Sequence, residues 1–229
     1  DRIAALGGSL SVQNRMSFQG SVFLDRYGAA ATARTPPVRA MLDRGLTVAA
    51  GTDATRVSSY NPWVSLHWLI TGQTVGGTPL YPPANLLDRQ QALDLYTRGG
   101  ARLTGEEDVK GLLREGCYAD LAVLSHDYLT VPAETIPDIE SVLTVVGGRI
   151  VHAAAEYAGL EEAVPPVSPA WSPVAHFGGY AARGDGAAQA DTVAELVAES
   201  ERHRAWRAAR TGTDPVPGPT YPVDPCLTH

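Results

Sequence analysis

The chain has 229 residues, 44% of them hydrophobic, which is enough apolar material to bury a core as one large or two small domains. Its formal net charge of −7 argues against nucleic acid as a partner, because phosphate binding requires clustered Lys and Arg side chains. No apolar stretch approaches the ~20 residues that cross a membrane, and the two distant cysteines lack metal-ligand spacing, so we expect a cytoplasmic globular protein that does not associate with membranes.

The first residues predict a short helix followed by a strand. Residues 1–7 form the helix, which Gly7 ends, and residues 9–13 alternate polar and apolar side chains as a strand does. We expect a loop after this strand. The loop carries three aromatic residues: Phe18, Phe23 and Tyr27.

A helix and a second strand come next. Thr35 is expected to cap the helix, which begins with Pro36 in its first turn and ends at Gly45. Residues 46–50 then form the strand. Strand, helix and strand with short connections predict a βαβ unit.

Asp53 lies at the end of the second strand, in the run Ala50-Gly51-Thr52-Asp53-Ala54. Gly51 lets the backbone turn closely, and Asp53 presents a carboxylate where a parallel strand ends, the place at which α/β barrels keep their catalytic groups. The alternative is that Asp53 only caps the helix that follows, because Asp is a preferred N-cap residue.

Two helices are predicted beyond this point. The first covers residues 61–72, opened by a proline and closed by a glycine, and its apolar residues lie all round, so it should be largely buried. The second begins with a capping-box pattern at Asp88 and Gln91, carries an apolar stripe, and is expected to stop at Gly99-Gly100.

The pattern then changes to antiparallel strands. A turn leads into a strand that ends at Leu124, and Gly147-Gly148 joins residues 141–146 to residues 149–152 as a hairpin. From Val164 onward the composition shifts to Pro, Ala and Gly, which predicts a linker or tail, with one helix over residues 191–210.

An ordered series of motifs resembles the C-terminal half of amidohydrolase family 3, in the metal-dependent TIM-barrel hydrolase superfamily. The order is the specific part of the resemblance, which covers residues 1–155. The motifs are Gly51-Thr52-Asp53-Ala54, Ala92-Leu93-Asp94-Leu95-Tyr96-Thr97, Gly105-Glu106-Glu107, Lys110-Gly111-Leu112, the run from Gly116 to Leu124, and the run from Val145 to Val151.

The resemblance implies an α/β fold: the C-terminal part of a TIM (β/α)8 barrel, a small antiparallel β-sandwich portion, and a helical, Pro-rich tail. The corresponding boundaries are 1–105 for the barrel segment with strands seven and eight, 106–160 for the sandwich portion and 161–229 for the tail. It further implies metal-assisted hydrolysis of carbon–nitrogen bonds in an amide-like small molecule, with zinc the favoured metal. Asp53 matches the aspartate that ends barrel strand eight, which binds the metal and takes the proton of the attacking water.

The other ligands of that family are absent from this sequence. It contains no His-x-His pair, and its single lysine, Lys110, lies in the turn before the antiparallel strands. Since a catalytic zinc needs about three protein ligands, Asp53 cannot hold one alone. We therefore expect a fragment that is inactive by itself, begins after barrel strand six, and forms a homo-oligomer or pairs with an N-terminal segment.

Strand ends and the loop after strand eight face the pocket in this architecture, which gives five substrate-side candidates. These are Gln13, Arg56, Asn61, Trp63 and Trp68. For the tryptophans the alternative is core packing, and for Arg56 it is a solvated charge. His67 is expected to be a core or rim histidine rather than a ligand.

The sequence favours a metal-dependent hydrolase. The alternative is a non-catalytic assembly or interaction subunit that completes a barrel.

Overall fold

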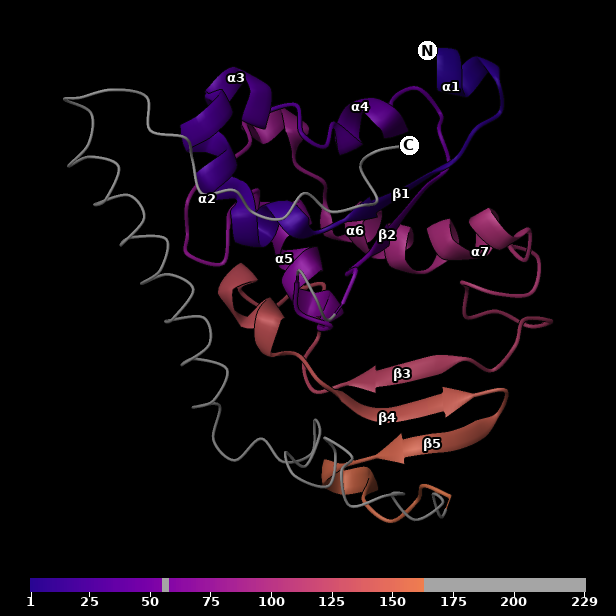
Figure 1. The fold of residues 1–229 in the computed structure, drawn as a ribbon. Coiled ribbons are helices and arrows are strands. Elements are labelled where there is room, and N and C mark those ends of the chain that lie inside the picture. The colour runs from indigo at the N-terminus through magenta and orange to yellow at the C-terminus, as the bar shows by residue number, and fades with distance from the viewer. Residues whose placement is uncertain (55–57, 163–229) are drawn as a thin grey trace, which may run out of the picture.

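A computed structural model describes residues 1–54 and 58–162 of the chain (Figure 1). The predicted helix over residues 191–210 and the Pro-rich tail lie outside the described residues. The N-terminal elements in chain order are α1 (Arg2–Ala5), β1 (Leu10–Gln13), α2 (Arg15–Tyr27), α3 (Ala29–Thr32), α4 (Val38–Leu42) and β2 (Val48–Gly51).

β1 and β2 are parallel neighbours, which confirms the predicted βαβ unit. The register pairs Leu10 with Val48 and Gln13 with Gly51, so both strands end at the same edge. Val12 and Val48 are 6% and 3% exposed and belong to the core. The carboxyl ends of the two strands therefore form one short rim beside that core.

The expected aromatic loop is wrong, because residues 15–27 form helix α2. The helix buries Met16 together with three small residues, Ser17, Gly20 and Ser21. A Cβ on Gly20 would lie only 2.4 Å from Leu80 Cδ1, so the helix packs closely against the 74–80 segment. Only Met16 among the four buried residues is large and apolar, so the apolar stripe that marks a helix is short here.

The cap of α4 also differs from the prediction. Thr35 donates its hydroxyl to the carbonyl of Ala31 at 2.9 Å, and the helix begins at Val38 after Pro37, with no side-chain cap. Thr35 is thus used by the preceding turn instead of the following helix, since a threonine hydroxyl can satisfy a carbonyl four residues earlier.

The next elements are α5 (Pro62–Thr71), the 3₁₀ turn η1 (Pro83–Asn85), α6 (Arg89–Tyr96) and α7 (Arg98–Thr104). The capping box of α6 is confirmed, with Gln91 N donating to Asp88 Oδ1 at 2.7 Å. The predicted stop at Gly99-Gly100 is wrong. The break falls at Thr97, and both glycines lie inside α7.

The core lies between the β1–β2 pair and helices α5 and α6, with α7 against β2 (Figure 1). Its largest fully buried side chains include Trp68 and Leu66 of α5. As the sequence predicts, α5 is mostly buried.

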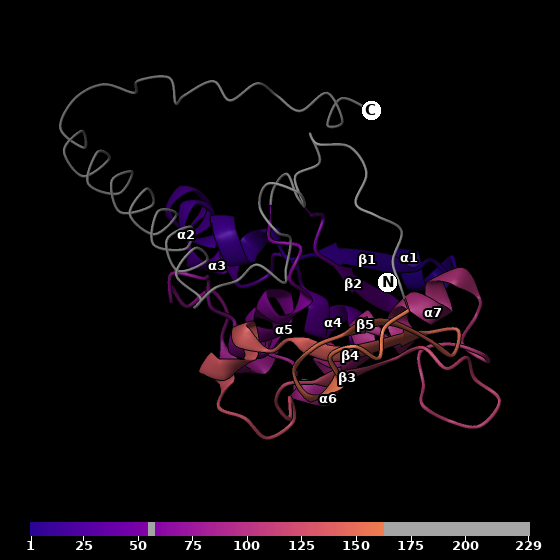
Figure 2. The ribbon, with the colours of Figure 1, turned by 90° about the horizontal axis from the view of Figure 1, so that it is seen from below.

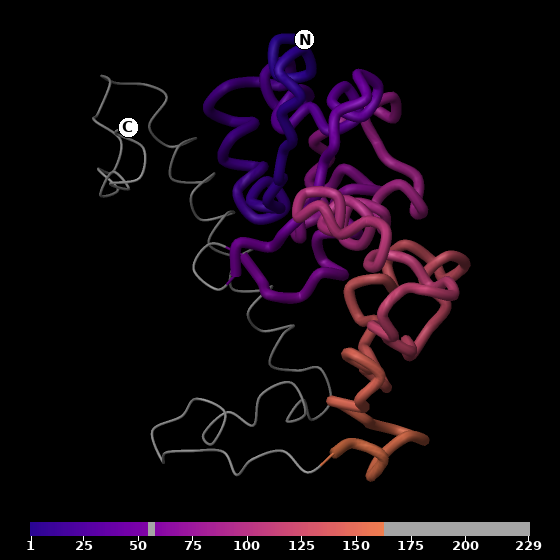
Figure 3. The backbone as a smooth tube through the Cα atoms, turned by 90° about the vertical axis from the view of Figure 1, so that its right-hand side faces the viewer, coloured from indigo at the N-terminus to yellow at the C-terminus, as the bar shows by residue number. Residues whose placement is uncertain are grey.

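The last elements are β3 (Leu121–Leu124), η2 (Ala133–Asp138), β4 (Ser141–Val146), β5 (Arg149–Ala153) and η3 (Ala155–Tyr157). They form a three-stranded antiparallel sheet in the order β3-β4-β5, and the predicted hairpin is confirmed, with positive φ at both Gly147 and Gly148. Figure 3 shows this sheet, in the pink to orange part of the chain, below the indigo and purple helical part, and in the view from below it overlaps the helices (Figure 2).

The segment between β3 and β4 returns to the helices and ties the two parts together. Tyr128, Ile136 and Ile139 are at most 3% exposed and join the core. Arg89 of α6 donates to the carbonyls of Tyr128 and Val131, and the Tyr128 hydroxyl donates back to the Arg89 carbonyl. The described residues are thus a mixed α/β structure with a small antiparallel sheet. None of their helices is long and apolar enough to cross a membrane.

Candidate functional site

The carboxyl ends of β1 and β2 place Gln13, Gly51 and Asp53 at the same rim. Gln13 and Gly51 are register partners, and Asp53 follows Gly51 by two residues. Gln13 and Asp53 are exposed there. The prediction of a carboxylate at the end of a parallel strand therefore agrees with the backbone.

Asp53 adopts a left-handed backbone conformation with φ of 52°, which is uncommon for a residue with a Cβ. Its side chain makes no hydrogen bond or ion pair with another described residue. The helix that follows is capped by Asn61, whose Oδ1 accepts from Trp63 N at 2.9 Å. Asp53 is therefore not the cap of α5, and its carboxylate is not used in any interaction that holds the described residues together.

Asn61 and Trp68, both expected on the substrate side, are 0% and 1% exposed. Besides capping α5, Asn61 donates from Nδ2 to the carbonyl of Pro137 at 3.0 Å, which fixes η2 to the start of the helix. Trp68 packs in the core beside Tyr81, with ring centroids 6.0 Å apart. Neither side chain reaches the surface of the described residues.

Trp63 is half-buried on α5, with its ring 5.7 Å from that of Tyr128. Arg56, the remaining substrate-side candidate, lies outside the described residues. Of the four candidates among the described residues, only Gln13 is thus placed at the rim beside Asp53.

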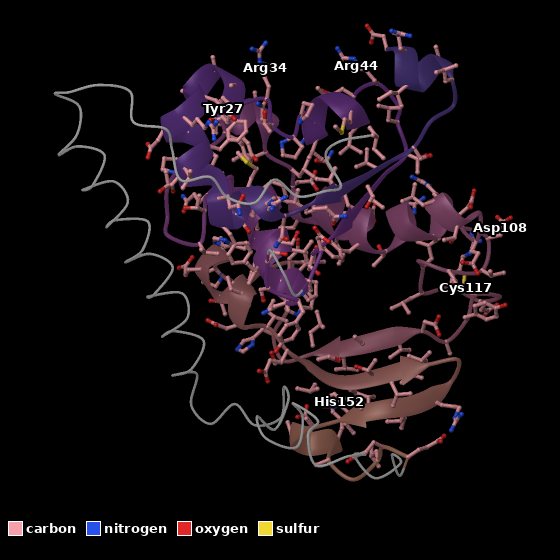
Figure 4. All side chains as sticks on the ribbon, in the orientation of Figure 1. Tyr27, Arg34, Arg44, Asp108, Cys117 and His152 are labelled. Carbon is pink, nitrogen blue, oxygen red and sulfur yellow. The ribbon has the colours of Figure 1, made fainter. Side chains whose placement is uncertain are left out.

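His67 is a partly buried residue of α5, as the sequence predicts for a core or rim histidine. Burial lowers the pKa of His67 from its ordinary value of 6.5, and the Glu134 carboxylate opposes part of that change. The Nδ1 atom of His126 lies 3.0 Å from the hydroxyl oxygen of Ser125. His152 is exposed on β5 (Figure 4). None of these three histidines belongs to a group of three possible metal ligands among the described residues.

Within residues 1–54 and 58–162, no three His, Cys, Asp or Glu side chains gather as a metal site would require. Cys117 lies beside Asp108 in the turn after α7 and donates to its carbonyl at 3.7 Å (Figure 4). Asp53 alone does not fit a catalytic zinc, which takes about three protein ligands and one open position.

One polar residue at this strand end escaped the sequence analysis. Asn14 follows Gln13, is 0% exposed, and has both amide atoms buried without a hydrogen-bond partner among the described residues. The alternating pattern of β1 could have predicted that Asn14 is buried, because residues two apart, such as Val12 and Asn14, point to the same side of a strand.

Comparisons with known proteins agree on one family. The amidohydrolase family matches residues 1–152. The Bacillus subtilis protein YtcJ, which is named as an amidohydrolase, is 26% identical over 131 residues, covering 56% of this chain and 25% of that protein. The N-substituted formamide deformylase of Arthrobacter pascens is 29% identical over 112 residues, covering 49% of this chain and 20% of the deformylase.

A solved structure has a related fold. The uncharacterized metal-dependent hydrolase from Pyrococcus horikoshii OT3 superposes with a TM-score of 0.50 at 24% identity, covering 58% of this chain and 27% of that one. The chain matches only about a quarter or less of the length of the curated relatives. With two thirds of its residues inside the family match, the chain belongs to the amidohydrolase family.

Proposed function

We propose that this chain supplies the C-terminal part of a metal-dependent hydrolase that cleaves carbon–nitrogen bonds in amide-like small molecules. The observation that carries the proposal is Asp53, an exposed carboxylate at the end of a parallel strand with no partner among the described residues. Such strand ends are where α/β barrels place catalytic groups. Family membership and the name of the formamide deformylase support a hydrolase of this type.

In this proposal β1 and β2 are strands seven and eight of a TIM barrel, and the β3–β5 sheet is part of a β-sandwich. The parallel pairing of β1 and β2, with helices between them, is consistent with that assignment. The remaining metal ligands come from polypeptide outside the described residues. Because the family's other metal ligands are absent from this sequence, we expect the chain to be inactive by itself.

The expected metal is zinc, which when bound would lower the pKa of a water molecule. Asp53 would be one of its ligands, and its carboxylate would accept a proton from the attacking water. Exposure at the rim leaves that carboxylate accessible for both roles. Trp63 and Arg56 are proposed on the substrate side.

The second candidate is a non-catalytic assembly subunit. It is favoured by the lack of any cluster of three metal-ligating side chains among the described residues. The two proposals differ in whether Asp53 affects turnover once the chain is assembled with the residues that complete the site.

Replacing Asp53 by Asn tests the catalytic proposal. We expect the assembled enzyme to lose about 10²-fold or more in turnover of N-substituted formamides, because the proton acceptor is gone, while its far-UV circular dichroism stays unchanged. Asp25→Asn, an exposed carboxylate on α2, is the matched control and should leave turnover unaltered. Normal turnover by a folded Asp53→Asn variant would favour the assembly subunit.

A further inference from the structure

Gln13 and Gly51 contact each other across the two parallel strands. They share a face with the pair Ser11 and Ala49, of which Ser11 is exposed and Ala49 is buried, whereas Val12 projects to the opposite face, into the core. Gln13 is exposed and lies in the last residue pair of the sheet. Its side chain is therefore available at the rim and is not held in the core.

The carboxamide of Gln13 occupies the space that a side chain on residue 51 would fill. A Cβ on Gly51 would lie 2.9 Å from Gln13 Oε1 and 3.9 Å from its Cδ. Gly51 is not among the glycines with positive φ, so its backbone conformation does not demand glycine. A Cβ on residue 51 would therefore require the end of the Gln13 side chain to move.

Asp53 follows Gly51 by two residues, just beyond the end of β2. Its left-handed backbone turns the chain at the point where the Gln13 carboxamide covers β2. A neutral carboxamide and a carboxylate thus come from the ends of adjacent strands. The carboxamide offers both a donor and an acceptor, whereas the ionised carboxylate only accepts.

We propose that Gly51 holds the Gln13 carboxamide over the end of β2, and that this carboxamide orients the amide-like group of the substrate beside Asp53. The inference rests on the proposed function and narrows it to neutral substrates that present a carbonyl and an N–H. Because the carboxamide carries no charge, it binds these groups while leaving the charge of Asp53 intact. Gln13 is thus a substrate-binding residue, and Gly51 is a positioning residue that acts through it.

Kinetics of the assembled enzyme test this pairing. Gln13→Ala and Gly51→Ala should each lower kcat/KM for N-substituted formamides about tenfold, the effect of one neutral hydrogen bond. The double variant should be no worse than Gln13→Ala, because both changes remove the same contact. Ser11→Ala, on the same face one pair earlier, is the control. Full activity of either single variant, or additive losses, would overturn the inference.

A second measurement separates this inference from the proposed function. In the 229-residue chain, the side-chain amide resonance of Gln13 can be assigned in a ¹⁵N spectrum by its loss in Gln13→Ala. Gly51→Ala should shift that resonance and leave the melting temperature nearly unchanged, since only the end of a flexible side chain must move. An unshifted resonance would overturn the Gly51 contact. An unmodified enzyme that hydrolyses no amide-like substrate would instead refute the proposed function.

Discussion

Gly99 allows helix α7 to lie against the strand that leads to Asp53. A Cβ at this position would be 2.4 Å from Val48 O, 3.1 Å from Ala49 Cα and 3.2 Å from Asp94 O. All three are backbone atoms, so no side-chain rotation relieves the overlap. Gly99→Ala must therefore push α7 away from β2, by about 1 Å to restore an ordinary contact with the Val48 carbonyl.

The cost follows from two opposing effects. Overpacking of this kind costs about 1–3 kcal/mol, and overlap with rigid backbone belongs at the upper end. Alanine in place of glycine inside a helix recovers about 1 kcal/mol. We expect Gly99→Ala to lower the free energy of unfolding by about 2 kcal/mol.

The neighbouring glycine provides the control. A Cβ on Gly100 meets nothing within 4 Å, so Gly100→Ala should raise the free energy of unfolding by about 0.5–1 kcal/mol. Urea unfolding at 25 °C, followed by far-UV circular dichroism, measures both variants, and equal m-values confirm that the same transition is compared. A Gly99→Ala variant as stable as Gly100→Ala would refute the close packing of α7 on β2.

Three further predictions concern the helices and the rim. Arg89→Ala should lower the free energy of unfolding by about 2–3 kcal/mol, because the carbonyls of Tyr128 and Val131 lose a charged donor. The control is Arg44→Ala, at an ion pair whose side chains are 49% and 90% exposed, which should change the free energy of unfolding by less than about 0.5 kcal/mol. Similar effects of the two variants on urea unfolding would contradict this prediction. Burial lowers the pKa of His67 from 6.5, so the unfolded chain binds more protons and stability should fall as pH drops below about 6.5. His67→Gln should flatten that part of the stability–pH curve, and an unchanged slope would exclude His67 as its source. The 229-residue chain alone should bind zinc with a Kd of about 10⁻⁶ M or weaker by calorimetry, because Asp53 lacks companion ligands among the described residues. Tight, stoichiometric zinc binding would show that the chain contains other ligands.

Local features of the sequence were enough to predict several elements and the position of Asp53. The capping box at Asp88 and Gln91, the hairpin at Gly147-Gly148 and the parallel strand ending before Asp53 all agree with the structure. These signals operate between residues close in the chain, through a cap, a turn or an alternating strand. They therefore persist whatever packs around them.

Burial and contact between distant residues were decided by the tertiary structure. Helix α2 packs Gly20 against Leu80. Asn61, a substrate-side candidate from the sequence, is instead buried and bonded to Pro137 of η2, 76 residues later in the chain. The Gln13–Gly51 contact likewise exists only because strand pairing brings the two residues into register. Residue type and spacing specify what a side chain can do, whereas the elements that pack around it determine whether it is exposed and what it touches.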